Sequence, residues 1–337
     1  MIILKDGSVE PWLSDELFNI TGNHHIIGSE KSTKINIRNK SRIQRIFILH
    51  FDYIKIAIKG LKLVKRDDTI ICLLDIIGIY VIILSLFSFK RIKILLINIM
   101  VNDDNSFISS LKIKIYRKIL SKKNVYSSVN TSGLREHFNE TLRFNIKRMF
   151  LLKDSYTKYN YLQKNVTANE GYIFVGGSNA RDWKMVYNVA KKIPEQKFVV
   201  VSPKLQENLK GLKNVELFIN VDIDIFINLL SKSSICWLPL TTQSAAGIIV
   251  LLQSALLKKP ILSTSSFVMC DYIDDGINGL LHDQGNVDMA IQQINILNNS
   301  NHLYDEFSRK MFLKVLNENK PSTYLFELYE IYKTTLK

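Results

Sequence analysis

The sequence predicts an α/β fold with parallel sheets, organised in two domains. Short apolar runs typical of buried strands alternate with segments of helical spacing along most of the chain, which is the pattern that parallel sheets require. The length of 337 residues suits about two domains, and a hydrophobic content of 47% is sufficient for two packed cores.

The first predicted domain, residues 1–164, alternates between strands and helices from its first residues. Strands are expected at Met1–Leu4, His24–Gly28, Arg45–His50, Thr69–Leu74, Ile92–Met100 and Asn124–Ser128, and helices at Asp15–Ile20, Ile54–Val64, Ile76–Phe89, Ile108–Leu120 and Gly133–Phe138. The run Arg45–His50 is also compatible with a helix.

The second predicted domain, residues 165–320, begins with the polar connection Asn165–Glu170 and then a strand that runs into a glycine turn. Further strands are expected at Lys197–Ser202, Val215–Ile219 and Ser234–Leu240, and helices from Arg181 to Ile193, at Asp224–Leu230 and within Asp271–Leu281. The tail, residues 321–337, carries an apolar stripe at helical spacing over Tyr324–Thr334, so we expect it to pack back on the first domain.

The most informative stretch is Ser244–Pro260, in which small residues open an apolar helix that Pro260 ends. Backbone N–H groups at the start of a helix lie at the positive end of its dipole, and small side chains leave them accessible to a phosphate. The stretch therefore predicts either a nucleotide-phosphate site or an ordinary strand-helix-strand repeat.

The apolar run Thr69–Phe89 is the only segment apolar enough to be considered as a membrane-spanning helix. Asp75 interrupts it, and Ile76–Phe89 alone is shorter than the roughly 20 residues that a spanning helix needs. A buried strand and a crossover helix explain the run better. Asp75 then follows the carboxyl end of a strand, where open α/β sheets bind ligands, so it is either an active-site acid or, more simply, a helix cap.

The cysteine and histidine content indicates a reduced protein without a metal site. The three cysteines, Cys72, Cys236 and Cys270, are scattered among apolar residues and suggest a cytoplasmic location. No His or Cys pair has metal-ligand spacing, and His24-His25 is best explained as the start of a strand. No signal peptide is expected, because Lys5-Asp6-Gly7 follows the first apolar run directly.

The formal charge of +14 is concentrated in the first half of the chain. Eleven Lys or Arg and one acid lie between Lys31 and Arg66, and six bases without an acid lie between Lys112 and Lys123. Such a surface could face nucleic acid, an anionic membrane or only solvent. No zinc finger, RNA-recognition motif or helix-turn-helix is present, so we expect no nucleic-acid partner. Lys112, Lys118 and Lys122 are expected to share a helical face toward an anionic membrane.

Five sequence blocks in the second half together resemble the C-terminal half of GT-B glycosyltransferases of the large retaining group, glycosyl transferases group 1. They are Phe174-Val-Gly-Gly with Arg181 and Lys184, Leu238-Pro239, Ser244–Gly247, Leu252-Gln253-Ser-Ala with Lys259-Pro260, and Asp275-Gly-Ile-Asn-Gly-Leu. The first half resembles that family only in its alternation. The resemblance implies two Rossmann-like domains whose parallel sheets face each other across a cleft, with the donor on the second domain and the acceptor on the first.

The resemblance also implies which residues bind the sugar-nucleotide donor, a UDP-sugar, without a metal or another cofactor. Arg181 and Lys184 would neutralise the diphosphate, and Gln253 would hold the ribose. The remaining donor-binding candidates are Gly176, Gly177, Ser244, Ala245, Ala246 and Gly247.

The chain departs from the family pattern at three places. Ala245 stands where the family has the first of two glutamates, and Gln253 stands in place of the second. The N-terminal histidine of the family has no clear counterpart, which makes Asp75 the candidate catalytic residue. Asp222-Ile-Asp224 matches the metal-binding pattern of the rival GT-A fold, but its position before a helix favours capping.

We therefore expect a metal-independent, retaining glycosyltransferase that acts on a lipid-linked or saccharide acceptor in bacterial surface polysaccharide synthesis. It would act in the cytoplasm, peripherally bound to the inner face of the plasma membrane. A non-catalytic partner subunit with the same fold is the alternative. A sugar-nucleotide epimerase of similar fold is a further alternative. It would need carboxylates that face the cleft as acid and base, and Asp75 is the one candidate for that role.

Overall fold

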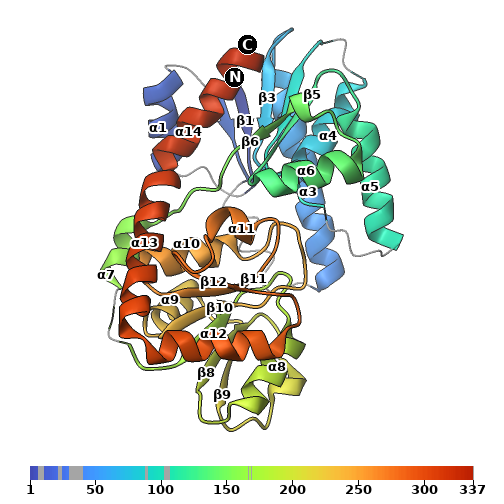
Figure 1. Cartoon of the computed structure of the whole chain (residues 1–337). Coiled ribbons are helices and arrows are strands. Elements are labelled where there is room, and N and C mark those ends of the chain that lie inside the picture. The colour runs from blue at the N-terminus through green and yellow to red at the C-terminus, as the bar shows by residue number, and fades with distance from the viewer. Residues whose placement is uncertain are drawn as a thin grey trace. The chain divides into compact units, whose positions relative to one another are not determined.

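The computed structural model describes residues 1–6, 11–21, 25–29, 41–87, 90–101, 107–165, 167 and 169–336, and every structural statement below refers to these residues. The chain forms two compact units. Unit 1 comprises residues 1–153 and 322–337, and unit 2 comprises residues 154–321 (Figure 1). Several residues with sequence-based expectations, including His24 and Phe89, lie outside the described residues.

Unit 1 contains a six-stranded parallel sheet with the strand order β2-β1-β3-β4-β5-β6. Its strands are β1 (Ile2–Leu4), β2 (His25–Ile27), β3 (Thr69–Cys72), β4 (Lys93–Leu96), β5 (Val125–Val129) and β6 (Met149–Leu151). Ile2 pairs with His25 on one side and with Ile70 on the other, which places β1 inside the sheet. The apolar runs of β1 and β3 are fully buried, as expected for strands covered on both faces.

Helices cover both faces of this sheet (Figure 1). They are α1 (Pro11–Thr21), α3 (Arg42–Leu63), α4 (Asp75–Ser85), α5 (Phe107–Leu120), α6 (Ser132–Leu142) and α14 (Pro321–Ile331), with a 3-10 turn at Ile146–Arg148 and a π-helical end at Tyr332–Leu336. Leu17 of α1 and Leu325 of α14 share one hydrophobic core with Ile3 and Ile71 of the sheet. On the opposite face, Gly60 of α3 lies against Leu4.

The strand expected at Arg45–His50 is wrong, because this run lies inside the 22-residue helix α3. The helix begins with a capping box in which Gln44 N–H donates to Ser41 Oγ and Ser41 N–H donates to Gln44 Oε1. These reciprocal bonds satisfy two backbone donors that would otherwise be unpaired at the start of a helix. The apolar run therefore continues the helical spacing of Ile54–Val64.

Unit 2 contains a second six-stranded parallel sheet, with the order β12-β11-β10-β7-β8-β9. Its strands are β7 (Ile173–Gly176), β8 (Phe198–Ser202), β9 (Val215–Ile219), β10 (Ile235–Leu238), β11 (Ile261–Thr264) and β12 (Leu280–His282). Fully buried Phe198 and Trp237 belong to the hydrophobic core of this unit. The two parallel sheets confirm the predicted α/β class.

Helices accompany the strands of unit 2, with α8 after β7 and α10 after β10. They are α7 (Tyr159–Lys164), α8 (Trp183–Lys192), α9 (Ile223–Ser231), α10 (Ile248–Leu256), α11 (Met269–Tyr272), α12 (Val287–Asn299) and α13 (Asn301–Glu318), with a 3-10 turn at Glu207–Leu209. Residues 154–164, which the sequence assigned to the first domain, lie in unit 2. Gln163 Nε2 donates to Leu256 O at 2.7 Å and Tyr156 N–H donates to Asn319 O at 2.9 Å, which attaches this segment to unit 2.

Candidate functional site

Backbone hydrogen bonds join the loop after β7 to the loop after β10, at the carboxyl edge of the sheet in unit 2. Arg181 and Leu240 form an antiparallel bridge. Asp182 N–H donates to Pro239 O at 2.9 Å, and Thr241 N–H donates to Ala180 O at 3.0 Å. These bonds fix the backbone of Arg181 at the edge where open α/β sheets bind their ligands.

The guanidinium of Arg181 is buried without a carboxylate partner. Its Nε donates to Gly176 O at 2.8 Å and its Nη1 donates to Asn179 O at 3.0 Å. The residue is 7% exposed, and no ion pair joins it to an acid of the described chain. Burial lowers the pKa of Arg181 to about 10, so the group keeps its charge at neutral pH. A buried cation held only by carbonyl oxygens is electrostatically suited to bind an anion.

Two glycines make room for protein groups in this loop. A side chain at Gly177, whose φ is +126°, would collide with the guanidinium of Arg181. A side chain at Gly176 would collide with the rings of Phe174 and Phe226, which form an edge-to-face pair. The space beside these two donor-binding candidates is thus filled by protein side chains, and their contact with a donor stays a prediction.

Helix α10 begins beside Arg181 without a side-chain cap. Its N-cap is Gly247, whose φ is +82°. Arg181 Nη1 lies 3.7 Å from the position that a Cβ of Gly247 would occupy. The guanidinium and the positive end of the α10 dipole therefore act on the same place. By contrast, the N-terminus of α8 is occupied, because Met185 N–H donates to the carboxylate of Asp182 at 2.9 Å.

The small residues before α10 complete this arrangement. Ser244 is buried and its N–H donates to Thr242 Oγ1 at 3.1 Å. Ala246 is buried as well, and Ala245 is half-buried. Their side chains are short, so none of them caps the N-terminus of α10, and the binding of a phosphate there stays a prediction. We call Arg181 with residues 244–247 the anion site.

Lys184 and Gln253, the other expected donor residues, lie outside the immediate anion site. Lys184 is exposed in the first turn of α8 and has no hydrogen bond or ion pair within the described chain. Gln253 is half-buried and lies on α10, about 9 Å along the helix axis from Gly247 at 1.5 Å per residue. It shares a helical face with Ile249, which is 72% exposed, so this face of α10 is open to solvent.

Asp75 in unit 1 connects three elements. Its carboxylate accepts hydrogen bonds from Ile76 N–H at 2.7 Å, from Met100 N–H at 3.2 Å and from the hydroxyl of Tyr116. Burial and the neighbouring carboxylate raise the pKa of Tyr116, so the phenol stays protonated and donates. Asp75 therefore links the start of α4 to the segment after β4 and to α5. The helix-cap interpretation is wrong, because the N-cap of α4 is Leu74 and Asp75 is the first residue of the helix. The catalytic role suggested for Asp75 stays a prediction.

The Asp-x-Asp motif holds a neighbouring helix in place. Asp222 is the N-cap of α9, although its side chain makes no capping bond. The hydroxyl of Tyr161 donates to Asp224 Oδ1 at 2.5 Å, which connects α7 to α9. In the described part of the chain, no three His, Cys, Asp or Glu side chains are grouped as metal ligands would be.

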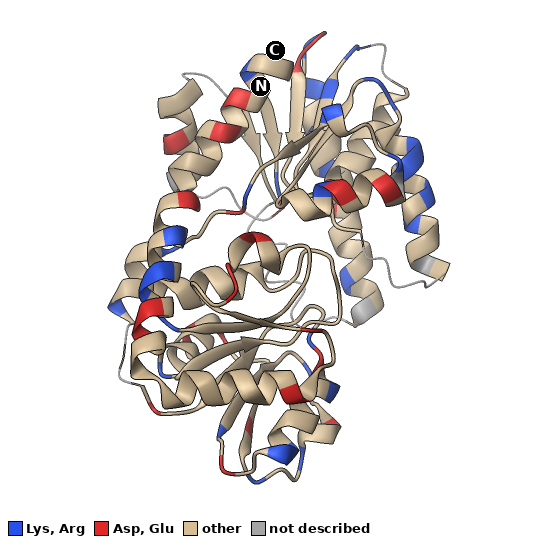
Figure 2. Cartoon of the chain, in the orientation of Figure 1, with Lys and Arg blue, Asp and Glu red and all other residues tan. Residues whose placement is uncertain are grey.

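The lysines expected to face a membrane do not form one helical face. Lys112 and Lys118 are exposed on α5, but Lys122 lies in the turn after the helix, which ends at Leu120. Figure 2 shows the basic residues spread along α5. Exposed apolar residues of α5, namely Phe107, Leu111 and Ile115, are interspersed with these lysines.

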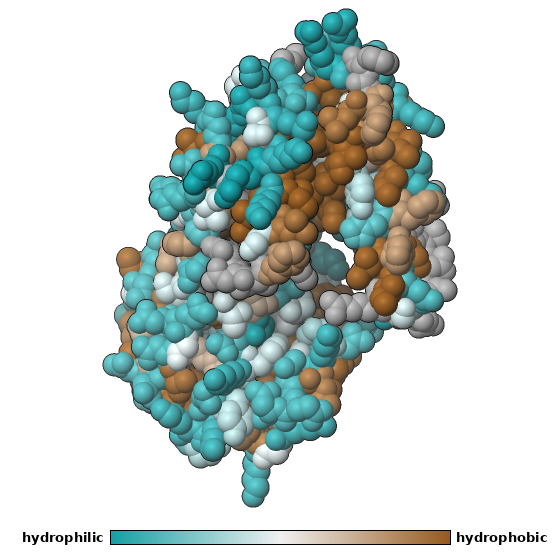
Figure 3. Space-filling view, turned by 90° about the vertical axis from the view of Figure 1, so that its right-hand side faces the viewer, coloured by the Kyte–Doolittle hydropathy of each residue, from teal (hydrophilic) through white to brown (hydrophobic). Residues whose placement is uncertain are grey.

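The sequence analysis missed an exposed apolar stripe on α3. Ile43, Phe47, Phe51 and Ile58 lie on one side of the helix and are all exposed, Phe47 by 73%. Lys55 borders the stripe, with its ammonium 4.6 Å from the ring centroid of Phe51. Figure 3 shows hydrophobic surface gathered over unit 1, to which α3 belongs. The four-residue spacing from Ile43 to Phe51 was the signal that could have revealed the stripe. No helix of the described chain is long and apolar enough to cross a membrane.

Comparisons with known proteins agree with the geometry of unit 2. Residues 171–299 match the model of the family described as glycosyl transferases group 1. No curated protein matches this sequence.

Solved structures of similar fold cover nearly the whole chain. A glycosyltransferase from Rickettsia africae is 18% identical, with a TM-score of 0.69, and the match covers 100% of this chain and 98% of that one. HepE of Anabaena, in complex with UDP, is 13% identical, with a TM-score of 0.71 and 99% of both chains covered. WaaG, a glycosyltransferase involved in lipopolysaccharide biosynthesis, is 13% identical, with a TM-score of 0.64 and 99% and 100% covered.

These matches confirm the resemblance that the sequence motifs indicated. The fold shared with these structures is GT-B, with two Rossmann-like domains. The family match over residues 171–299 includes Arg181 and residues 244–247.

Proposed function

We propose that this protein is a glycosyltransferase that moves a sugar from a nucleoside diphosphate, a UDP-sugar, to a lipid-linked or saccharide acceptor. The observation that carries the proposal is Arg181, a buried cation without a carboxylate partner, beside the uncapped start of α10. Unit 2 would hold the donor, and unit 1 would hold the acceptor.

Sugar transfer requires stabilisation of the negative charge that develops on the leaving diphosphate. The forked guanidinium of Arg181 can donate to phosphate oxygens, and the dipole of α10 adds roughly half a positive charge at its N-terminus. Lys184, which is exposed and has no side-chain partner among the described residues, would contact the outer phosphate. This set of donors would stabilise the leaving group without a divalent metal.

The similar structures support the choice of donor. HepE has been crystallised with UDP and with UDP-glucose. WaaG is described as acting in lipopolysaccharide biosynthesis, which supports a role for this chain in bacterial surface polysaccharide synthesis. The proposed reaction retains the configuration of the sugar, as the resemblance to the large retaining group implies.

Turnover of a panel of UDP-, GDP- and ADP-sugars in the presence of EDTA tests this function. We expect slow hydrolysis of at least one UDP-sugar, and loss of that hydrolysis in Arg181→Met. If UDP binds but no sugar nucleotide is turned over with any acceptor, the protein is the non-catalytic partner subunit. Ala245 is the observation that favours this second candidate, because a methyl group cannot replace the hydrogen bonds of a glutamate. Absence of nucleotide binding would contradict both.

We also propose that unit 1 binds the inner face of an anionic membrane through the exposed stripes of α3 and α5. Apolar side chains there alternate with exposed bases, including Lys55, Lys59 and Lys62 on α3 and Lys112 and Lys118 on α5. Such helices lie in the interface with their apolar side in the headgroup region, and each nearby base contributes about 1 kcal/mol.

Co-sedimentation with vesicles that contain phosphatidylglycerol tests the membrane proposal. Binding should increase with the anionic fraction, weaken with salt and fall strongly in Phe47→Ser/Phe51→Ser. Phe18→Ser is a matched control, because Phe18 is 61% exposed on α1, away from both stripes. Equal binding of all three proteins, or none at all, would contradict the proposal.

A further inference from the structure

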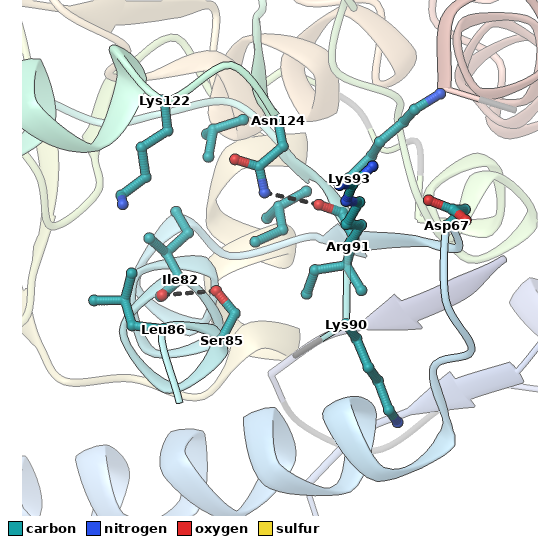
Figure 4. A pocket seen from close by; sticks show the side chains of 12 residues that line it. Asp67, Ile82, Ser85, Leu86, Lys90, Arg91, Lys93, Lys122 and Asn124 are labelled. Carbon is teal, nitrogen blue, oxygen red and sulfur yellow. Dashed lines mark hydrogen bonds between the residues drawn. The ribbon is translucent and has the colours of Figure 1, made fainter. Parts of the chain in front are cut away.

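A cavity lies in unit 1, at the amino ends of its strands. It has a volume of about 420 Å³ and is lined by the C-terminal end of α4, the starts of β4 and β5 and the turn after α5 (Figure 4). We call it the amino-edge pocket. Asp75 and Met100 lie at the opposite, carboxyl edge of the same sheet, where α/β proteins bind their substrates.

One side of the amino-edge pocket is apolar. Ile82 and Leu86 come from the end of α4, and Ile94 and Val125 come from β4 and β5. Ile94 and Val125 are fully buried, whereas Leu86 is exposed at the rim. This wall offers an apolar group a contact surface that excludes water.

The rim of the pocket is basic. Lys90, Arg91, Lys93 and Lys122 line it, against a single acid, Asp67, which faces Arg66 at 3.9 Å. Two of these bases differ in their surroundings. Lys90 Nζ is already engaged, because it donates to Leu61 O at 3.0 Å and to Val64 O at 2.7 Å at the end of α3. The side chain of Lys122 has no hydrogen bond or ion pair within the described chain.

Arg91 is likewise without a side-chain partner among the described residues. Figure 4 shows Lys122 extending over the side of the pocket formed by Ile82 and Leu86, while Lys90 points away toward α3. The neighbouring polar side chains already donate to backbone carbonyl oxygens. Ser85 Oγ donates to Ile82 O at 2.8 Å, and Asn124 Nδ2 donates to Ile92 O at 2.7 Å. The pocket therefore combines an apolar wall with two available cations.

We propose that the amino-edge pocket binds a phosphate ester that carries an apolar group. The phosphate lies at the basic rim, where Arg91 and Lys122 attract and hold it, and the apolar group lies against Ile82, Leu86, Ile94 and Val125. Arg91 contributes planar paired donors and Lys122 a compact charge. The ligand is either a dissolved organic phosphate or the head region of a membrane lipid. The site is at the opposite sheet edge from Asp75, and its existence does not rest on the proposed transferase activity.

Direct binding of octyl phosphate, at concentrations below micelle formation, tests this site by calorimetry. The lining variant Arg91→Gln/Lys122→Gln should bind at least about tenfold more weakly than the wild type. Lys65→Gln/Lys123→Gln is the matched control, because it removes the same charge from exposed neighbours that do not line the pocket, and it should bind like the wild type. Circular dichroism checks that both variants are folded.

Two further ligands and a filling variant separate the two parts of the site. Octyl glucoside, which lacks the charge, should bind more weakly than octyl phosphate, and so should inorganic phosphate, which lacks the chain. Ser85→Phe should fill the pocket and reduce octyl phosphate binding while the bases remain. Equal binding of octyl phosphate to the lining and control variants, or no binding to the wild type, would overturn the proposal.

Vesicles that contain phosphatidic acid distinguish the two sources of the ligand. If the lining variant loses vesicle binding that the control variant keeps, the ligand is a membrane lipid. If octyl phosphate binding depends on Arg91 and Lys122 but vesicle binding does not, the ligand is a dissolved phosphate. These experiments measure binding and no turnover. If octyl phosphate does not bind, the proposed transferase activity is not contradicted, and if the transferase assay fails, the binding of octyl phosphate is not contradicted.

Discussion

The guanidinium of Arg181 occupies the space in which a side chain of Gly177 would lie. Arg181 Nη2 is 2.5 Å from the position of a Cβ at Gly177, closer than any real Cβ contact. The two residues are four positions apart in a loop whose backbone is held to the loop after β10. The glycine therefore determines where the cation can lie, and the cation determines which residue is tolerated at position 177.

We expect Gly177→Ala to displace Arg181 from the anion site. UDP affinity should fall about tenfold or more, because charge-assisted hydrogen bonds to the phosphates are lost. Gly171→Ala is the control, since Gly171 also has a positive φ, +79°, but no atom lies near its Cβ position. Both variants should lose about 1–2 kcal/mol of stability from backbone strain. Calorimetric titration with UDP decides, and unchanged affinity in Gly177→Ala would contradict the predicted link between the residues.

Arg181→Met should lower kcat/KM by about 10²-fold to 10³-fold, the cost of removing one preorganised donor from a developing anion. The midpoint of urea unfolding should change little, because losing the bonds to Gly176 O and Asn179 O is offset by removing a buried charge. Lys184→Met, at an exposed position, should reduce kcat/KM by less than tenfold. A larger effect at Lys184 than at Arg181 would reverse the assignment of the main phosphate ligand.

The sequence was sufficient to predict the class of fold and the position of the small residues that precede helix α10. Buried parallel strands are continuous apolar runs, and small residues before an apolar helix are a local signal, so neither depends on distant contacts. The run Arg45–His50 was predicted wrongly because short apolar runs do not distinguish strand from helix. The capping box of Ser41 and Gln44 carried the missing information.

The contacts around individual side chains could not be predicted. That Gly177 accommodates Arg181, and that the hydroxyl of Tyr116 donates to Asp75, depends on loops and helices that meet only in the folded chain. The position of Lys122 outside α5 depended on where the helix ends, and helix boundaries are the least certain part of a pattern.

Gly78→Ala should destabilise unit 1. A Cβ at this position of α4 would collide with Leu96 Cδ2 and would lie 3.4 Å from Cys72 Cβ, because the helix packs directly on β4. Overpacking of this kind costs about 1–3 kcal/mol. Urea unfolding measures the loss. The double variant Gly78→Ala/Leu96→Ala should lose less than the sum of the two single changes, because the second substitution removes the colliding atom. Strict additivity would show that the collision is relieved in another way.

His282 makes the stability of unit 2 depend on pH. Trp237 Nε1 donates to His282 Nε2 at 2.9 Å, and His282 Nδ1 lies 2.9 Å from Asp283 O and donates to it, so the buried ring is neutral and uses both nitrogens. Burial is the main cause that lowers the pKa of His282, against the raising effect of Asp283. The unfolded chain therefore binds a proton more readily than the folded one, and stability is lost as pH falls below the ordinary histidine value of about 6.5.

The free energy of unfolding, measured between pH 7.5 and 5 by urea titration with tryptophan fluorescence, should fall over this range in the wild type. In His282→Phe the stability at pH 7.5 should be lower, since Trp237 Nε1 is left without its acceptor, but the fall toward pH 5 should be smaller. His25→Gln, at an exposed position, should keep the pH dependence of the wild type. An identical pH dependence in His282→Phe and the wild type would assign the acid sensitivity to other groups.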